Sequence, residues 1–258
     1  MKTFVRNMIT LGVLAVVAAG SIALRAYTLK ERRLLTCDEI RVEYSDDFRV
    51  VSEEDVKQYL AKNYGAYVGQ RLDSIRLDRI EEMLDTQSAV NKCQAFITDD
   101  RILHIRLAQR VPVVRFRNGY EWYYADEKGY VFPLQSGYSA RLPIIDGNVP
   151  LSIPPGYKGQ PLDEKERRWM HGVVDLVQNM AKSKVWTENI AQIHVDDQGD
   201  LIMIPRQGNE TFIFGSPFES KEKLKKMGDY YKYIVPEKGR DYYSTINLKY
   251  DNQIICKQ

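Results

Sequence analysis

The feature that most constrains this chain is an uncharged stretch close to its start. Residues 7–24 contain no charged side chain and lie between Arg6 and Arg25. In a helix, a stretch of this length would extend about 27 Å at roughly 1.5 Å per residue, close to the thickness of the hydrocarbon core of a bilayer. We therefore expect residues 7–25 to form a single transmembrane helix, preceded by a short tail of residues 1–6.

Two alternatives to a retained membrane helix are open at this point. The small residues Ala18, Ala19, Gly20 and Ser21 near the end of the stretch also suit a signal peptide that is removed after export. A helix buried in a protein core is the second alternative. Basic residues flank the stretch on both sides, so charge alone leaves its orientation in a membrane open.

The rest of the composition is that of a folded protein with one or two domains. The sequence has 258 residues, and its 37 basic and 35 acidic residues give a net charge of +2. The strong basic excess that is typical of nucleic-acid-binding proteins is therefore missing. The three cysteines, Cys37, Cys93 and Cys256, allow at most one disulfide and do not occur in a zinc-binding spacing.

Motifs for catalysis or metal binding are missing from the sequence. None of the three histidines occurs in a metal-binding spacing, and the glycine motifs of hydrolases and phosphate-binding loops are absent. The histidines are His104, His171 and His194. Asp196 and Asp197 precede Gln198-Gly199, which predicts a turn, and Cys93 is expected to be buried in a strand. We therefore expect no enzymatic activity, no cofactor, no metal, no nucleic acid and no small-molecule substrate.

The hydrophobic period predicts a small α/β module at residues 37–110, after a linker at residues 26–36. Residues 39–44 alternate between apolar and polar side chains, as in a half-buried strand. Ser52 is followed by three acidic residues, which predicts the capped start of a helix. The expected strands and helices, in the order β-α-α-β-β, are 39–44, 52–64, 74–85, 91–98 and 101–109.

Residues 111–258 are predicted to form a mostly antiparallel β domain with two helices, so the whole fold is α+β. Asn118-Gly119 predicts a tight hairpin turn, because both residues tolerate positive φ. The helices are expected at about 162–182 and 218–234. The expected strands are 113–117, 120–124, 130–132, 190–196, 200–205, 210–214 and 245–255.

The order of these parts resembles the FtsQ/DivIB family of bacterial cell-division proteins. A β-α-α-β-β module directly after a membrane anchor is similar to a POTRA domain. Residues 109–113, QRVPV, resemble the ERxPV junction of the family, although Gln109 replaces the usual acid. Residues 123–132 and 142–147 resemble the family patterns yyvDxxGxvF and LPxixG. The resemblance implies a non-enzymatic divisome protein of the inner membrane, located at the division septum with its N-terminus in the cytoplasm and its bulk in the periplasm.

The closing strand is the best candidate for a binding site. Ile246, Leu248 and Tyr250 alternate with polar residues, and the segment resembles the family strand vDLRYxxG, which receives FtsB by strand addition at the edge of the sheet. The resemblance implies FtsB/FtsL-like division proteins as partners. It assigns partner binding to Thr245, Asn247, Leu248, Lys249, Tyr250 and Asp251. Lys249 matches a basic residue that pairs with an acid of the partner, but Asn252-Gln253 departs from the family pattern and no tryptophan follows.

Two further functions remain open from the sequence. One is an exported or anchored protein-binding module with a cleaved signal peptide that is unrelated to division. The other is an anchored hydrolase, which would need a catalytic group assembled from residues that are distant in sequence.

Overall fold

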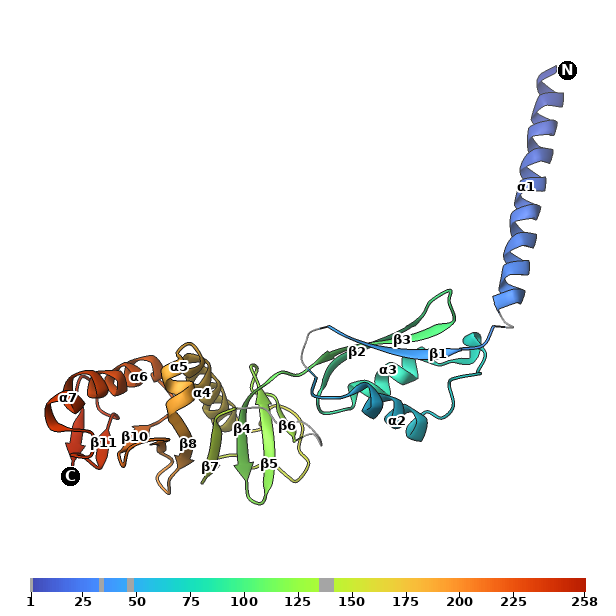
Figure 1. Cartoon of the computed structure of the whole chain (residues 1–258). Helices are drawn as coiled ribbons and strands as arrows, with labels where there is room; N and C mark the ends of the chain where they lie inside the picture. Colours follow the sequence, from blue (N-terminus) through green and yellow to red (C-terminus); the bar gives the residue numbers. More distant parts are fainter. Residues whose placement is uncertain (1, 33–34, 46–48, 135–141) are drawn as a thin grey trace. The chain divides into compact units, whose positions relative to one another are not determined.

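The computed structural model describes residues 2–32, 35–45, 49–134 and 142–258, with side-chain environments in the first helix for residues 12–27. The chain divides into two compact units (Figure 1). The first unit consists of residues 1–47 and 51–109, and the second of residues 48–50 and 110–258.

The first helix, α1 (Lys2–Arg32), contains the uncharged stretch. Its apolar side chains are exposed wherever they are described; Leu14, for example, is 68% exposed and Val16 is 72% exposed. No helix of the described residues is both long enough and apolar enough to cross a membrane. The membrane span at residues 7–25 therefore stays a prediction.

The rest of the first unit has the predicted order β-α-α-β-β. Its elements are β1 (Glu39–Tyr44), α2 (Glu53–Asn63), the 3₁₀ turn η1 (Leu72–Ser74), α3 (Leu77–Asp85), β2 (Val90–Ile97) and β3 (Ile102–Gln109). The strands form one sheet in the order β1-β3-β2, in which β1 is parallel and β2 antiparallel to the central β3. The two outer strands, β1 and β2, are therefore the margins of this sheet.

A local sequence signal explains where α2 begins, whereas α3 begins later than predicted. The Ser52 side chain accepts a hydrogen bond from the Asp55 amide, and the Asp55 carboxylate accepts one from the Ser52 amide, both at 3.1 Å. The predicted cap at Ser52 is confirmed, and caps of this kind contribute about 1 kcal/mol to stability. The second helix was predicted to begin at Ser74, but it begins at Leu77, because Ile75 has an extended backbone that separates η1 from α3.

The core of the first unit lies between the sheet and its two helices. Leu103, Ile105 and Leu107 of β3 are fully buried, as the alternating pattern predicts. They pack in one cluster with Leu60 of α2 and with apolar residues of α3. Burial on one side of the central strand therefore holds both helices against the sheet.

The second unit is one large sheet with helices packed on it. The nine strands lie in the order β12-β11-β10-β9-β8-β7-β4-β5-β6. The strands are β4 (Pro112–Asn118), β5 (Glu121–Asp126), β6 (Val131–Pro133), β7 (Ile144–Gly147), β8 (Ile190–Val195), β9 (Leu201–Pro205), β10 (Thr211–Gly215), β11 (Thr245–Asn247) and β12 (Ile255–Lys257). The helices are α4 (Glu164–Ala181), α5 (Lys184–Asn189), α6 (Ser220–Asp229), the π-helix η2 (Tyr230–Ile234) and α7 (Val235–Lys238).

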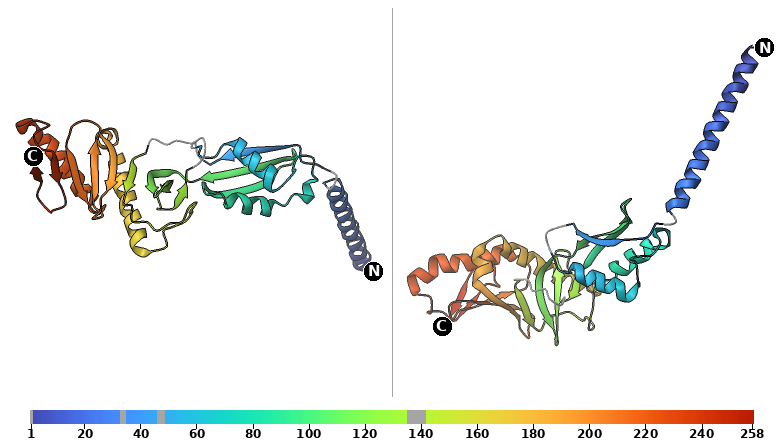
Figure 2. Two further views of the ribbon diagram at one scale, coloured as in Figure 1. Left: turned by 90° about the horizontal axis from the view of Figure 1, so that it is seen from below. Right: turned by 45° about the vertical axis from the view of Figure 1, so that its right-hand side comes forward.

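The sheet of the second unit is mixed, with more antiparallel than parallel pairs. Of its pairs, β4–β7, β7–β8 and β10–β11 are parallel, and the other five are antiparallel. Two parallel pairs arise because a helical connection carries the chain back to the same end of the sheet, through α4 and α5 after β7 and through α6 after β10. Figures 1 and 2 show α4 and α6 along one face of the sheet.

The turn between β4 and β5 differs by one residue from the prediction. Asn118 pairs with Glu121, so the two-residue turn is Gly119-Tyr120 and not Asn118-Gly119. Among these residues only Gly119 has positive φ, at 62°. A glycine in the first central position is typical of a type II′ turn, whereas the Asn-Gly prediction implied type I′.

Candidate functional site

The chain end differs from the single long strand predicted at residues 245–255. β11 contains only Thr245–Asn247, and the chain returns as β12 at Ile255–Lys257. β11 pairs with β10 on one side and with β12 on the other. The expectation that residues 245–251 form the edge of the sheet is therefore corrected: the edge strand at this end is β12.

Side-chain hydrogen bonds explain why the strand stops after Asn247. The Asn247 side chain accepts a hydrogen bond from the Lys249 amide at 2.9 Å, a local turn typical of asparagine. Lys226 of α6 donates to the carbonyl oxygens of Leu248 and Tyr250, at 2.5 and 2.7 Å. These two carbonyl groups are therefore held by the helix and do not continue the β11–β12 pairing.

The six predicted partner-binding residues fall into different environments. Thr245 and Asn247 are half-buried in β11, and Leu248 is fully buried in the core. Tyr250, which is 49% exposed, and Asp251 lie on the surface of the loop before β12. Whether these residues contact a partner stays a prediction; the structure gives Tyr250 and Asp251 the most open positions.

Lys249 already has a partner within the chain. Its ammonium group forms an ion pair with Asp200, which lies just before β9. Lys249 donates a hydrogen bond to the Asp200 carboxylate, and this bond raises the pKa of Lys249 above its ordinary value. Its aliphatic part lies over Gly215, where a Cβ atom would approach Lys249 Cγ to 2.7 Å. An acid of a partner protein would therefore have to compete with Asp200 for this lysine.

Among the described residues, no strand pairs with the outward backbone groups of β12 at the margin of the sheet. The Ser244 amide donates to the Lys257 carbonyl at 2.9 Å, so the backbone of Lys257 faces β11. Because backbone groups alternate along an antiparallel strand, the N–H and C=O of Cys256 point away from β11. In the part of the chain that the structure describes, no strand lies on that side.

A hollow of 760 Å³ lies next to the start of β12. It is formed by one side of α6 and by the loop that leads into the edge strand. Its lining residues are Glu222, Lys225, Lys226, Asp229, Asp251, Asn252, Gln253 and Ile254. A polypeptide that pairs with β12 would have room for side chains in this hollow, among charges of both signs.

The opposite margin of the same sheet is partly closed. Val131 of β6 exchanges two backbone hydrogen bonds with Gly159, each at 2.9 Å. Gly159 therefore occupies the backbone groups of Val131 that a neighbouring strand would otherwise pair with. The contrast makes β12 the stronger candidate for pairing with another polypeptide.

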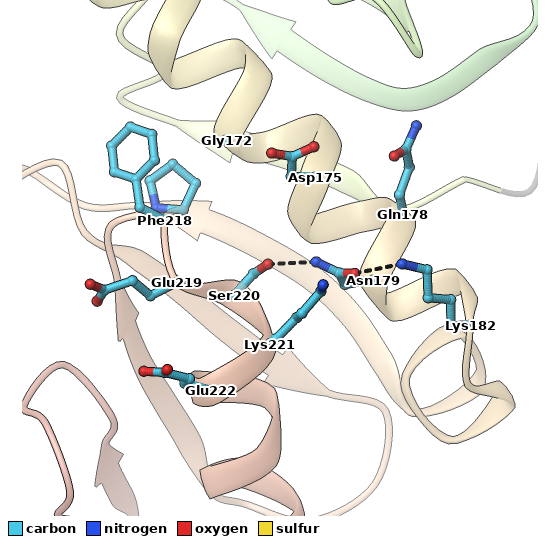
Figure 3. Close-up of a pocket in the computed structure, with 11 residues that line it drawn as sticks. Gly172, Asp175, Gln178, Asn179, Lys182, Phe218, Glu219, Ser220, Lys221 and Glu222 are labelled. Atoms are coloured by element: carbon cyan, nitrogen blue, oxygen red, sulfur yellow. Dashed lines mark hydrogen bonds between the residues drawn. The ribbon is translucent and has the colours of Figure 1, made fainter.

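A second hollow, of 480 Å³, lies between α4 and the start of α6 (Figure 3). The Asn179 side chain bridges the helices, donating to the Ser220 hydroxyl and accepting from Lys182, both at 2.9 Å. These polar groups satisfy one another, so the arrangement explains the packing of α4 on α6 without a ligand. No group of metal-binding side chains occurs among the described residues, and the absence of a metal or cofactor stays a prediction.

Comparison with protein families agrees with this two-unit architecture. Residues 111–257, more than half of the chain, match the family described as FtsQ/DivIB, C-terminal related. Residues 36–108 match the POTRA-like domain. No curated protein matches the chain. The chain therefore belongs to the FtsQ/DivIB family.

Proposed function

We propose that this protein is a non-enzymatic cell-division scaffold that recruits FtsB/FtsL-like partners by strand addition to β12. Its family is one of non-enzymatic division proteins, which supports a role in division. The observation that supports docking at β12 is its position at the edge of the sheet, with the backbone of Cys256 directed away from β11. A partner strand would satisfy these groups, and its side chains would determine specificity.

The surroundings of β12 suit a partner strand with both apolar and polar side chains. Ile255 is 38% exposed, and Tyr250 adds an aromatic surface on the adjoining loop. Asp251 and Lys257 are exposed charges close to the same margin. We expect the partner to cover the apolar residues and to place polar groups opposite the charges.

The proposal includes a single membrane anchor at residues 7–25. Its support is the uncharged stretch and the exposed apolar side chains of α1, which need lipid or protein to cover them. In this arrangement the N-terminus lies in the cytoplasm, and the POTRA-like and C-terminal domains lie in the periplasm at the division septum. Tethering of both partners to one bilayer raises their effective concentration, so that modest edge pairing suffices.

A proline substitution in β12 tests the docking site. Cys256→Pro removes the outward N–H, and proline is tolerated on an edge strand when its missing N–H faces solvent. Cys256→Ala is the matched control, because it removes the thiol and keeps the N–H. We expect Cys256→Pro to weaken binding of the FtsB-like partner by at least about tenfold, the effect of losing a backbone hydrogen bond and a fitted strand.

Affinity should be measured by calorimetric titration, with thermal unfolding of both variants as a check on folding. A folded Cys256→Pro variant that binds with the affinity of the control would exclude β12 as the docking strand. In cells, depletion of the protein should give undivided filaments. A purely metabolic defect would instead contradict a role in division.

A further inference from the structure

The POTRA-like domain has a margin whose outward amides are occupied by its own side chains. β2 pairs with β3 on one side only. The Cys93 amide donates to the Asp85 carboxylate at 2.6 Å, and the Ala95 amide donates to the Glu81 carboxylate at 2.7 Å. Both acids belong to α3. The helix therefore supplies hydrogen-bond acceptors to the edge strand.

The register of the sheet shows that these two amides are the ones a neighbouring strand would use. Thr98 donates to the Ile102 carbonyl at 3.3 Å across the β2–β3 turn, so the backbone of Thr98 faces β3. Alternation along an antiparallel strand then directs the amides of Cys93 and Ala95 away from β3. Both donors are satisfied by carboxylates in the positions where an incoming strand would place its carbonyl oxygens.

The spacing of the two acids matches the spacing of the two amides. Glu81 and Asp85 lie four residues apart on the helix, about 6.0 Å along its axis at 1.5 Å per residue. Cys93 and Ala95 lie two residues apart on the strand, about 6.8 Å at 3.4 Å per residue. One face of α3 therefore presents acceptors at nearly the repeat of a β-strand.

We infer that Glu81 and Asp85 act as a substitute for a neighbouring strand and close the β2 margin against pairing with a second copy of this chain. A long open edge is a template for self-association, and proteins commonly block such edges with charged side chains. An identical edge would have to displace two charge-assisted hydrogen bonds and bring the carboxylates of both copies together. The inference involves no division partner and is independent of the proposed function.

Two double variants separate this role from a general contribution to folding. Glu81→Ala with Asp85→Ala removes both acceptors. Glu81→Gln with Asp85→Asn is the matched control, because each amide side chain keeps a carbonyl oxygen of the same size in the same place. We expect the wild type and the control to remain monomeric, and the alanine variant to self-associate as its concentration rises from micromolar to millimolar.

The measurements are sedimentation velocity on the full chain in detergent and amide hydrogen exchange at Cys93 and Ala95. Under dilute, monomeric conditions the alanine variant should exchange these two amides at least about tenfold faster than the wild type, the effect of losing a hydrogen bond to a charged acceptor. Raising the concentration should slow that exchange again, because a second β2 edge then covers the amides.

An alanine variant that stays monomeric while both amides exchange rapidly would overturn the inference. If the double alanine variant loses its fold, the single variants Glu81→Ala and Asp85→Ala decide the question in the same way. A folded single variant that shows a freed amide and no gain in self-association at any concentration would equally contradict the closing role.

Discussion

The edge strands β2 and β12 of the two domains differ in whether their outward backbone groups are occupied by side chains of the same domain. β2 of the POTRA-like domain has eight residues, and two of its outward amides are held by carboxylates of α3. β12 of the C-terminal domain has three residues, and the backbone of Cys256 points outward with no strand beside it in the described part of the chain. The longer margin is closed, and the shorter margin is open.

The short length of β12 bears on how specific the proposed docking can be. A long free edge exposes many hydrogen-bonding groups and pairs readily with any strand. A short edge offers few such groups, so in the proposed docking at β12 a partner would gain additional energy from side chains around Tyr250 and in the hollow beside Ile254. An open edge of three residues therefore favours a fitted partner over non-specific pairing.

The largest expected effect is a loss of stability on truncating a buried side chain that follows β11. Leu248 directly follows β11 and is fully buried in the core, so Leu248→Ala leaves a cavity and should lower the free energy of unfolding by about 2–5 kcal/mol. All three tryptophans lie in the C-terminal domain, so tryptophan fluorescence during urea unfolding reports on this domain alone.

The matched control for this variant is Tyr250→Ala, two residues away on the surface. Tyr250 is 49% exposed, and its replacement should change stability by less than about 0.5 kcal/mol. An equal loss in the two variants would contradict the buried position of Leu248.

The second prediction compares the cysteines of the two margins. Burial, followed by the charges of Asp85 and Glu81, raises the pKa of Cys93 to about 12, and burial also raises the pKa of Cys256. Cys93 is buried and Cys256 is half-buried. Because the thiolate is the reactive form, iodoacetamide should modify Cys256 at least about tenfold faster than Cys93 at neutral pH.

Peptide mass spectrometry measures both rates in one sample. Between pH 8 and 10 the rate at Cys93 should rise about tenfold per pH unit without a plateau, because its pKa lies above this range. The FtsB-like partner should protect Cys256 and leave Cys93 unchanged. Protection of Cys93 and not of Cys256 would instead indicate a docking site in the POTRA-like domain and would contradict docking at β12.

The sequence predicts much of both domains but misses the element that forms the open edge. The alternation of Leu103, Ile105 and Leu107 and the cap at Ser52 were sufficient because each signal is local and repeats along its element. β12 has only three residues, too few for a periodic pattern to be distinguished from a loop. The break after Asn247 depends on Lys226, which is distant in sequence.

The closing of β2 by Glu81 and Asp85 was also missed. Two acids four residues apart on a helix are ordinary surface residues by sequence. Their role depends on the tertiary placement of α3 beside the outward amides of β2. The ion pair of Lys249 with Asp200 similarly joins residues separated by 49 positions, and the resemblance to the family had assigned that lysine to a partner.

The smallest expected effect tests Lys249, where the sequence and the structure assign different partners. Lys249→Glu places a second negative charge beside Asp200 and should lower the free energy of unfolding by about 1 kcal/mol or less, because the lysine is partly exposed. The combined variant Asp200→Lys with Lys249→Glu restores an ion pair of reversed orientation and should recover this loss. Urea unfolding followed by tryptophan fluorescence measures both changes.

The same two variants decide whether Lys249 also contacts the partner. If an acid of the FtsB-like partner faces Lys249, both variants place a negative charge opposite that acid. Both should then bind the partner more weakly than the wild type, and high salt should reduce this difference in affinity. Affinity that returns with stability in the combined variant would show that Lys249 only holds the loop before β12. Docking at the edge would then depend on the outward backbone of Cys256 and on the exposed Tyr250, and at neither position would a partner compete with Asp200.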